Sequence, residues 1–340
     1  MLTNYCPLKD MPRLSCIEER LNAFRQQQRM QAGSLIITVF GDVVMPRGGS
    51  IWLGSLIELL SALDINERLI RTTVARLADD KWLNSSAHGR RANYALTASG
   101  LRRFEEASRH IYAAHAPTWD RRWRLILTVG EMGVRERDRV RKALFWQGFG
   151  MISPGCFVHP SADLTATLDA LLVDGLSESL GKLMPMVAAE THFGPSATDH
   201  DIVSRAWNLE ELAKSYLGFC KQYQPILESL RTDTHGLISG MNALLLRILL
   251  IHDYRRLLLR DPELPAVLAP QDWLGQKARL LCRELYLRLV PPSEAFLDKT
   301  MQLADRTVPK ALPMLSQRFK SDDPLIGPTQ VERSKFQRTA

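Results

Sequence analysis

Residues 51–101, IWLGSLIELLSALDINERLIRTTVARLADDKWLNSSAHGRRANYALTASGL, decide the fold of this chain. In their first part, apolar residues recur at positions i, i+4, i+7, i+8 and i+11, which is the spacing of one buried stripe along a helix. This stripe consists of Trp52, Leu56, Leu59, Leu60 and Leu63. Residues 64–66 predict a short turn, and a second helix is expected over residues 67–80. The stretch therefore begins with two helices joined by a turn.

The second helix of this pair has two chemically different faces. Its predicted inward face carries Ile70, Thr73, Val74 and Leu77, and its outward face carries Arg68, Arg71, Thr72, Ala75 and Asp79. An arginine can pair bidentately with guanine, a threonine can meet a phosphate or a thymine methyl group, and a small alanine allows close approach to base edges. The outward face is therefore predicted to enter a major groove. The alternative is a solvated arginine face without a ligand.

A basic hairpin is predicted next. Trp82 and Leu83 indicate a short strand, residues 85–91 a turn and residues 93–96 the returning strand, after which Thr97 is suited to cap a closing helix. Eight basic residues lie between positions 68 and 103 against two acidic ones, an excess that suits phosphate attraction. These elements predict a winged helix-turn-helix domain that binds double-stranded DNA. The predicted contact residues are Arg68, Arg71, Thr72, Arg76, His88, Arg90 and Arg91.

Length and composition limit the class of protein. A chain of 340 residues fits two or three domains, and its 45% hydrophobic and 24% charged residues are typical of a folded globular protein. The formal net charge of +7 permits nucleic acid as a partner. Five scattered cysteines without a CxxC pair predict a reduced, cytoplasmic setting. No signal peptide is expected, and the longest apolar run, interrupted by Arg247, is too short to cross a membrane.

The rest of the chain predicts an α+β protein with further domains. Residues 1–33 form a polar lead-in, and residues 34–114 form the winged domain, with residues 34–40 as its first helix. A β-α-β-α-β order over 117–200 predicts a ferredoxin-like central domain. Helical periodicity over 209–223, 237–260 and 273–290 predicts a helical domain within 204–300, broken by prolines in residues 261–265. Residues 301–340 are expected to form a tail that is loosely ordered from Pro309 onward.

Several runs of sequence resemble the phenylacetate-degradation repressor family (PaaX). They include GGSIWLGSL at 48–56, ERLIRT at 67–72, GRR at 89–91, LFWQGFG at 144–150, YRR at 254–256 and DPELP at 261–265. The resemblance implies a winged-helix domain, a ferredoxin-like domain similar to the Cas2 fold and a helical C-terminal domain. It also implies a dimeric repressor of aromatic-acid catabolic genes that leaves its operator on binding phenylacetyl-coenzyme A. A different acyl-coenzyme A is the alternative effector.

An effector site is predicted near the end of the helix over 237–260. Arg255 and Arg256 are candidates to hold the phosphates or pantetheine of a coenzyme A thioester, because such an anion calls for bidentate cations. The alternative is an ion pair with nearby acids that fixes the helix end; the candidates for that pairing are Asp253, Asp261 and Glu263. His252, Trp207 and Trp273 are candidates to line an aryl pocket, although aromatic residues at helical spacing are often core residues.

The sequence does not favour an enzyme. It lacks the HExxH, CxxC, GxSxG and P-loop patterns, so neither catalytic residues, a metal nor a cofactor is expected. The likeness to Cas2 raises a metal-nuclease alternative, which requires a carboxylate on the first central strand. Residues 124–130 contain none, and only Asp120 and Glu131 flank them. A protein-interaction adaptor is a further alternative, but it leaves the arginine face and the basic hairpin without a role.

Overall fold

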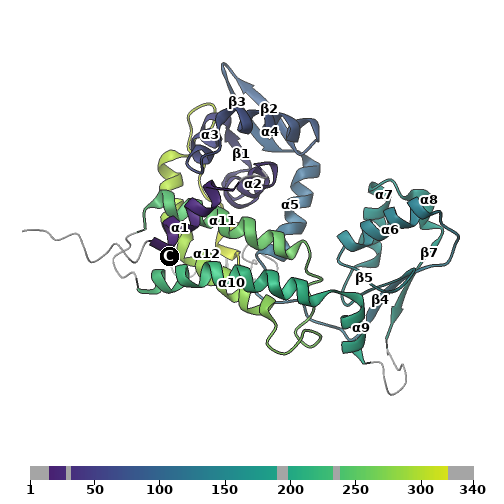
Figure 1. Ribbon diagram of the computed structural model, residues 1–340. Helices are drawn as coiled ribbons and strands as arrows, with labels where there is room; N and C mark the ends of the chain where they lie inside the picture. The colour runs from purple at the N-terminus through teal and green to yellow at the C-terminus, as the bar shows by residue number, and fades with distance from the viewer. Residues whose placement is uncertain (1–14, 28–31, 190–197, 233–237, 321–340) are drawn as a thin grey trace, which may run out of the picture. The chain divides into compact units, whose positions relative to one another are not determined.

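The computed structural model describes residues 15–27, 32–189, 198–232 and 238–320 and confirms the α+β class (Figure 1). The chain divides into two compact units. The first comprises Met1–Ala114, Phe219–Tyr254 and Ala278–Ala340, and the second comprises His115–Gly218 and Arg255–Lys277. Three long helices contribute residues to both units: α10 (Leu209–Thr232), α11 (Gly240–Leu258) and α12 (Leu274–Thr300). In the described parts of the chain, no helix combines the length and the apolar character that a membrane span requires.

The first unit contains an N-terminal head, residues 32–111. Its helices are α2 (Ala32–Val39), the π-helix η1 (Phe40–Val44), the 3-10 helix η2 (Met45–Arg47), α3 (Leu53–Ser61), α4 (Glu67–Asp79) and α5 (Ala98–Ile111). The strands β1 (Ser50–Trp52), β2 (Leu83–His88) and β3 (Arg91–Leu96) form an antiparallel sheet in the order β1-β3-β2. The expected order of helix, turn, helix, hairpin and closing helix is present.

Trp52 does not belong to the helix that the sequence predicted for it. It ends β1, where it pairs with Asn93 of β3, and α3 begins at the next residue. The other members of the stripe, Leu56, Leu59, Leu60 and Leu63, are buried as expected. The stripe continued to Trp52 in the sequence because the spacing of apolar residues alone does not distinguish a strand that leads into a helix from the helix itself.

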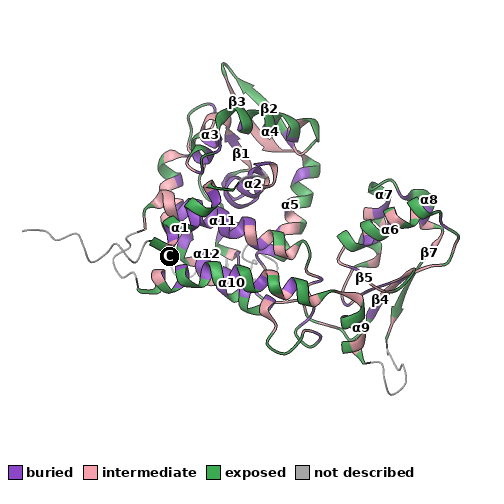
Figure 2. Cartoon of the chain, viewed as in Figure 1, coloured by how far each residue is buried: buried purple, intermediate pink, exposed green. Residues whose placement is uncertain are grey.

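A buried ionic cluster joins the head to the C-terminal helices. Asp42 lies in η1 and is fully buried; its carboxylate accepts hydrogen bonds from Arg247 of α11 at 2.7 Å and from Arg318 at 2.9 Å. The hydroxyl groups of Tyr112 and Tyr286 donate to the same carboxylate. Because a buried charge is tolerated only when it is paired and hydrogen-bonded, these contacts fix the head against α11 and α12. Figure 2 shows the buried character of α2 and α11 in this region.

The chain segment after α12 is packed against the head. Arg318 donates to the backbone oxygens of Gly41 and Asp42, and Phe319 lies against the rings of Tyr112 and Tyr286. The prediction of a loosely ordered tail is therefore wrong for residues 309–320. Composition misled it, because the buried side chains of Leu315, Arg318 and Phe319 anchor a segment that is otherwise rich in proline and polar residues. Residues 321–340 lie outside the described part of the chain.

The polar lead-in contains a helix with a definite packing role. Helix α1 (Ser15–Arg25) buries Ile17, Leu21 and Phe24. Its Arg20 is also buried, and its guanidinium lies 2.6 Å from the carboxylate of Asp253 on α11. The described part of residues 1–33 thus belongs to the core of the first unit. Residues 1–14 lie outside the described part.

The second unit is built on an antiparallel sheet in the order β5-β6-β4-β7. Its strands are β4 (Trp123–Thr128), β5 (Gly150–Ser153), β6 (Cys156–His159) and β7 (Leu183–Ala188), and its other helices are α6 (Val134–Trp146), α7 (Leu164–Val173), α8 (Ser177–Leu180) and α9 (Asp199–Ala206). The order β-α-β-β-α-β with this strand arrangement is that of a ferredoxin-like sandwich. The predicted single strand region at 150–160 is a hairpin, which supplies the fourth strand.

Each face of this sheet has its own cover. Ile126 and Phe157 pack with α6 and α7 on one face. Trp123, three residues before Ile126, and Val158, adjacent to Phe157, point to the other face and pack with Val203 of α9. Leu264 and Leu268 complete that second cluster, so the segment around the DPELP motif covers the central sheet. The compact units are consequently assembled from distant stretches of the chain.

Candidate nucleic-acid interface

Helix α4 exposes an arginine face because its apolar residues recur on the opposite side. Ile70, Thr73, Val74 and Leu77 are buried, as the sequence predicted. The side chain of Asn66 accepts a hydrogen bond from the backbone N–H of Leu69 at 2.8 Å and so caps the start of the helix. The exposed side of α4 carries Arg68, Arg71, Thr72, Ala75, Arg76 and Asp79.

The exposed side chains of α4 differ in how freely they could meet a ligand. Arg71 pairs with Glu67 one turn earlier at 2.7 Å, and the hydroxyl of Thr72 donates to the carbonyl of Arg68. Arg68 itself forms no ion pair with any residue that the structure describes. Arg76 extends beside Gly33 of α2. A β-carbon added to Gly33 would lie only 3.2 Å from the Nη2 atom of Arg76. Among the arginines of this face, Arg68 is therefore the one whose side chain is least engaged by other residues of the protein.

The β2–β3 hairpin ends in a tighter turn than the sequence predicted. His88 pairs directly with Arg91, so only Gly89 and Arg90 form the turn, and the strands take up most of residues 85–91. Gly89 has a φ of 60°, a left-handed conformation that glycine adopts without strain. The hairpin tip consequently exposes His88 and Arg90.

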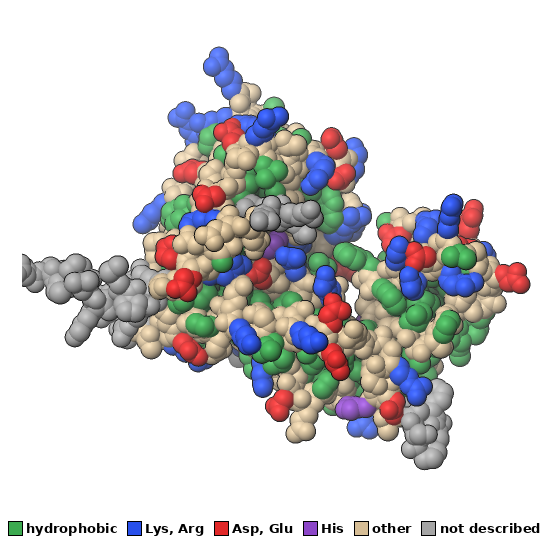
Figure 3. Space-filling view, in the orientation of Figure 1, with side chains coloured by type: hydrophobic (Ala, Val, Ile, Leu, Met, Phe, Trp, Pro, Cys, Tyr) green, Lys and Arg blue, Asp and Glu red, His purple; other side chains and the backbone are tan. Residues whose placement is uncertain are grey.

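Arg91 has a different environment from its neighbour at the hairpin tip. Its guanidinium carbon lies 4.3 Å from the centre of the Trp52 ring, and the residue is half-buried. Its Nη1 atom is buried and makes no hydrogen bond within the described residues. This stacking places Arg91 against the sheet, whereas Arg90 extends into solvent. Figure 3 shows basic side chains gathered at the end of the head that bears the hairpin.

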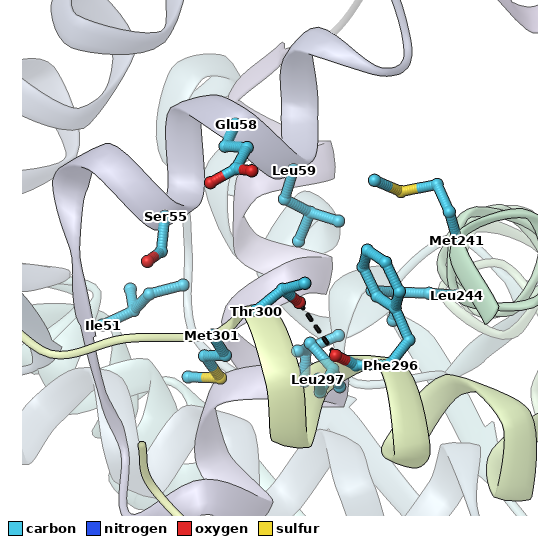
Figure 4. Close-up of a pocket in the computed structure, with 11 residues that line it drawn as sticks. Ile51, Ser55, Glu58, Leu59, Met241, Leu244, Phe296, Leu297, Thr300 and Met301 are labelled. Carbon is cyan, nitrogen blue, oxygen red and sulfur yellow. Dashed lines mark hydrogen bonds between the residues drawn. The ribbon is translucent and has the colours of Figure 1, made fainter. Parts of the chain in front are cut away.

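A pocket lies between the head and the C-terminal helices within the first unit (Figure 4). It has an empty volume of about 360 Å³ and is open to solvent. Its lining is mostly apolar, and its polar members are Ser55, Glu58 and Thr300. The hydroxyl of Thr300 donates to the carbonyl of Phe296, and none of the described residues that line the pocket is basic. None of the predicted effector residues lies in it, and sequence reasoning did not identify it.

The predicted effector residues fall in different units. His252 belongs to the first, where its Nδ1 lies 3.2 Å from the hydroxyl of Thr38 in a buried contact. Arg255 and Arg256 occupy the last turn of α11 and belong to the second unit, and Arg256 is exposed. Asp253, one suggested partner of these arginines, instead pairs with Arg20.

Trp207 and Trp273 also belong to the second unit. Trp207 stacks on Trp123 and donates through Nε1 to the carbonyl of Gly148, whereas Trp273 meets Tyr216 edge to face. These contacts favour the core alternative for both tryptophans, and their effector role stays a prediction. Within the described residues, no group of three or more His, Cys, Asp or Glu side chains is placed to hold a metal ion.

Comparison with known proteins agrees with this architecture. Family models match residues 31–100 (PaaX-like protein), 116–181 (PaaX protein central Cas2-like domain) and 207–299 (PaaX-like protein C-terminal domain). The transcriptional repressor PaaX of Escherichia coli (strain K12) is 35% identical over 289 residues, which cover 84% of this chain and 89% of the relative. The solved structure of the uncharacterized protein Rv0674 from Mycobacterium tuberculosis overlaps 71% of this chain and 89% of its own, with 20% identity and a TM-score of 0.45. The chain belongs to the family of PaaX-like proteins.

Proposed function

We propose that this protein is a transcriptional repressor that binds double-stranded operator DNA and controls genes of phenylacetate catabolism. The observation that carries the proposal is the exposed arginine face of α4 together with the exposed tip of the β2–β3 hairpin, which is the arrangement of a winged helix-turn-helix. The 35% identical repressor PaaX supports the regulatory role. In this proposal α4 enters the major groove, and His88 and Arg90 lie along the sugar-phosphate backbone.

The first prediction separates base contacts from phosphate contacts. Replacing Arg71 by alanine should weaken binding to the operator by about 1–3 kcal/mol and relax its sequence preference, because a bidentate contact to a base is lost. Replacing Arg90 by alanine should weaken binding to every duplex and reduce the slope of log affinity against log salt by about one unit. Fluorescence anisotropy with the operator and a scrambled duplex, at several salt concentrations, measures both effects.

Arg260→Ala is the matched control, because it removes an exposed arginine from the second unit. Its operator affinity should equal that of the wild type. If Arg71→Ala and Arg90→Ala also bind like the wild type while remaining folded, the proposed DNA-binding surface is wrong.

We also propose that the protein acts as a homodimer on an inverted repeat. A single head offers one helix and one hairpin, so two heads related by a twofold axis would contact two half-sites. Exposed apolar residues on the edge strand β7 support a self-association surface in the central domain: Met184, Met186 and Val187. Analytical ultracentrifugation should give the mass of two chains, free and on the operator, and a monomer in both cases would contradict the proposal.

The proposed effector is an aryl-acetyl-coenzyme A thioester, with phenylacetyl-coenzyme A as the first candidate and another acyl-coenzyme A as the alternative. Arg255 and Arg256 supply two adjacent guanidinium groups that suit its phosphates. The pocket in the first unit does not suit these phosphates, because its charged member is the acid Glu58. The proposal therefore assigns the anionic part of the effector to the end of α11.

A further inference from the structure

The segment that follows α12 runs along the head and reaches the β2–β3 hairpin. The backbone N–H of Trp52 donates to the carbonyl of Gln302 at 3.2 Å, and Gln302 also bonds to the hydroxyl of Ser55. Two residues further on, the N–H of Ala304 donates to the side-chain oxygen of Asn93 in β3 at 2.7 Å. Figure 1 shows this segment rising beside α3 toward the hairpin. Gln302 and Ala304 thus dock the segment onto β1, α3 and β3.

The sheet register shows which face of the hairpin this segment covers. Asn93 lies opposite Trp52 and two residues from Arg91, and Arg91 lies opposite His88. Side chains at such positions share one face of an antiparallel sheet. The segment therefore covers the outer face on which Arg91 stacks on Trp52, and it extends in the direction of His88.

A tight turn fixes the exposed end of the segment. The N–H of Leu303 donates to the carbonyl of Thr307, and the N–H of Arg306 donates to the carbonyl of Leu303. The carboxylate of Asp305 accepts hydrogen bonds from both the N–H and the hydroxyl of Thr307. These bonds hold the pKa of Asp305 below its ordinary value, and the charge of nearby His88 acts in the same direction. The Asp305 carboxylate is therefore engaged within the turn, next to the hairpin.

Arg306 is the cation that this turn presents to solvent. It is exposed, and it forms no ion pair with any residue that the structure describes. Its φ of 70° is a left-handed conformation that is unfavourable for an arginine, so the surrounding hydrogen bonds must hold it. An exposed, unpaired arginine whose backbone is held in a turn docked beside the hairpin that bears His88 and Arg90 has the chemistry of a phosphate contact.

We propose that Arg306 contacts a phosphate of the DNA backbone beside the β2–β3 hairpin, so that the segment after α12 forms part of the nucleic-acid interface. This inference rests on the proposed DNA-binding function. It makes the interface composite, with contributions from α4, from the hairpin and from a segment about 200 residues later in the chain. The contact would strengthen binding to any duplex, because a phosphate carries no sequence information.

The experiment compares duplex affinity and its salt dependence for three variants and the wild type. One lost phosphate contact should weaken binding about fivefold to tenfold near 0.1 M salt, equally for the operator and for an unrelated duplex, and reduce the salt slope by about one unit. Arg306→Gly should show this loss although glycine relieves the backbone strain and preserves folding. Arg306→Lys should retain most of the affinity. The control is Lys310→Ala, because Lys310 is exposed on the same segment and its ammonium lies 3.7 Å from Asp298.

The outcomes separate this inference from the proposed function. If the wild type shows no salt-dependent binding to any duplex, the proposed function fails. If the wild type binds and Arg306→Gly has the same affinity and salt slope as the wild type, the contribution of Arg306 is overturned while the function stands. A loss as large in Lys310→Ala as in Arg306→Gly would show that net charge alone is responsible and would also overturn the contact.

Discussion

Asp42 is a single residue on which the position of the head depends. Its carboxylate and backbone oxygen accept hydrogen bonds from the guanidinium groups of Arg247 and Arg318, which come from two distant parts of the chain. Burial raises the pKa of Tyr286 far above its ordinary value, so its hydroxyl stays protonated and donates to Asp42. Although burial alone would lower the pKa of Arg247, the charges of Asp42 and Glu294 hold it above its ordinary value. Both arginines are therefore paired with acidic side chains of the cluster.

Replacing Asp42 by asparagine should lower the free energy of unfolding of the first unit by about 3–5 kcal/mol, because it leaves the buried guanidinium of Arg318 without a carboxylate. Hydrogen exchange of the α11 backbone amides measures this loss. Asp79→Asn is the control, since Asp79 is exposed on α4, and it should leave exchange unchanged. Wild-type protection in Asp42→Asn would mean that the cluster does not stabilise the unit.

At the scale of elements, local patterns predicted the helices and strands of the head well. The buried face of α4, the hairpin and the closing helix α5 follow from spacing within about 20 residues, which a single sequence displays. Two helices exceed their predicted ends, which lay just before prolines. Helix α10 continues through Pro225, and α12 continues through Pro291 and Pro292.

Tertiary packing explains why these helices continue. Ile226 and Leu230 are buried beyond Pro225, and Leu297 is buried beyond Pro292. The hydroxyl of Ser293, directly after the prolines, donates to the carbonyl of Leu289 at 2.6 Å and so adds a hydrogen bond within this turn of the helix. The sequence favoured a break because proline removes an N–H from the helix, but the apolar face on its far side outweighs that cost.

The parts of the candidate site that depend on distant contacts were not predictable. Arg247 interrupts an apolar run, and a lone arginine in such a run implies a buried acidic partner, but no local pattern identifies Asp42. The docking of Ala304 on Asn93 similarly joins residues 211 positions apart. By contrast, Arg68 and Arg90 were correctly expected to be exposed, because helix periodicity and turn chemistry determine their position.

At the scale of the whole molecule, α11 links the head, which bears the proposed DNA-binding surface, to the residues that are proposed to bind the effector. Arg247 lies in the first unit and pairs with Asp42 of the head, and Arg255 lies two turns later in the second unit. A ligand at Arg255 and Arg256 would therefore act on the same helix that holds the head. This continuity suits a conformational relay better than direct competition between the ligand and DNA for one surface.

Such a relay makes a reciprocal prediction. If phenylacetyl-coenzyme A lowers operator affinity, the operator must lower the affinity for the thioester by the same factor, which typically lies between about 5-fold and 150-fold. Titration of the operator complex with phenylacetyl-coenzyme A, coenzyme A and phenylacetate, followed by anisotropy, measures the first effect. Calorimetric titration of thioester into free and DNA-bound protein measures the second. Phenylacetate alone should have little effect, because it lacks the phosphates that the arginines would recognise.

The Arg255→Ala, Arg256→Ala double variant tests where the thioester binds. It should bind the operator normally without ligand but require a higher concentration of thioester for release, because a charge-assisted contact to the phosphates is lost. Arg260→Ala, which removes an exposed arginine from the same unit, should respond like the wild type. Release by phenylacetate alone would contradict the assignment of a thioester. Undiminished release from the double variant would place the effector elsewhere and leave DNA binding by α4 and the hairpin unaffected.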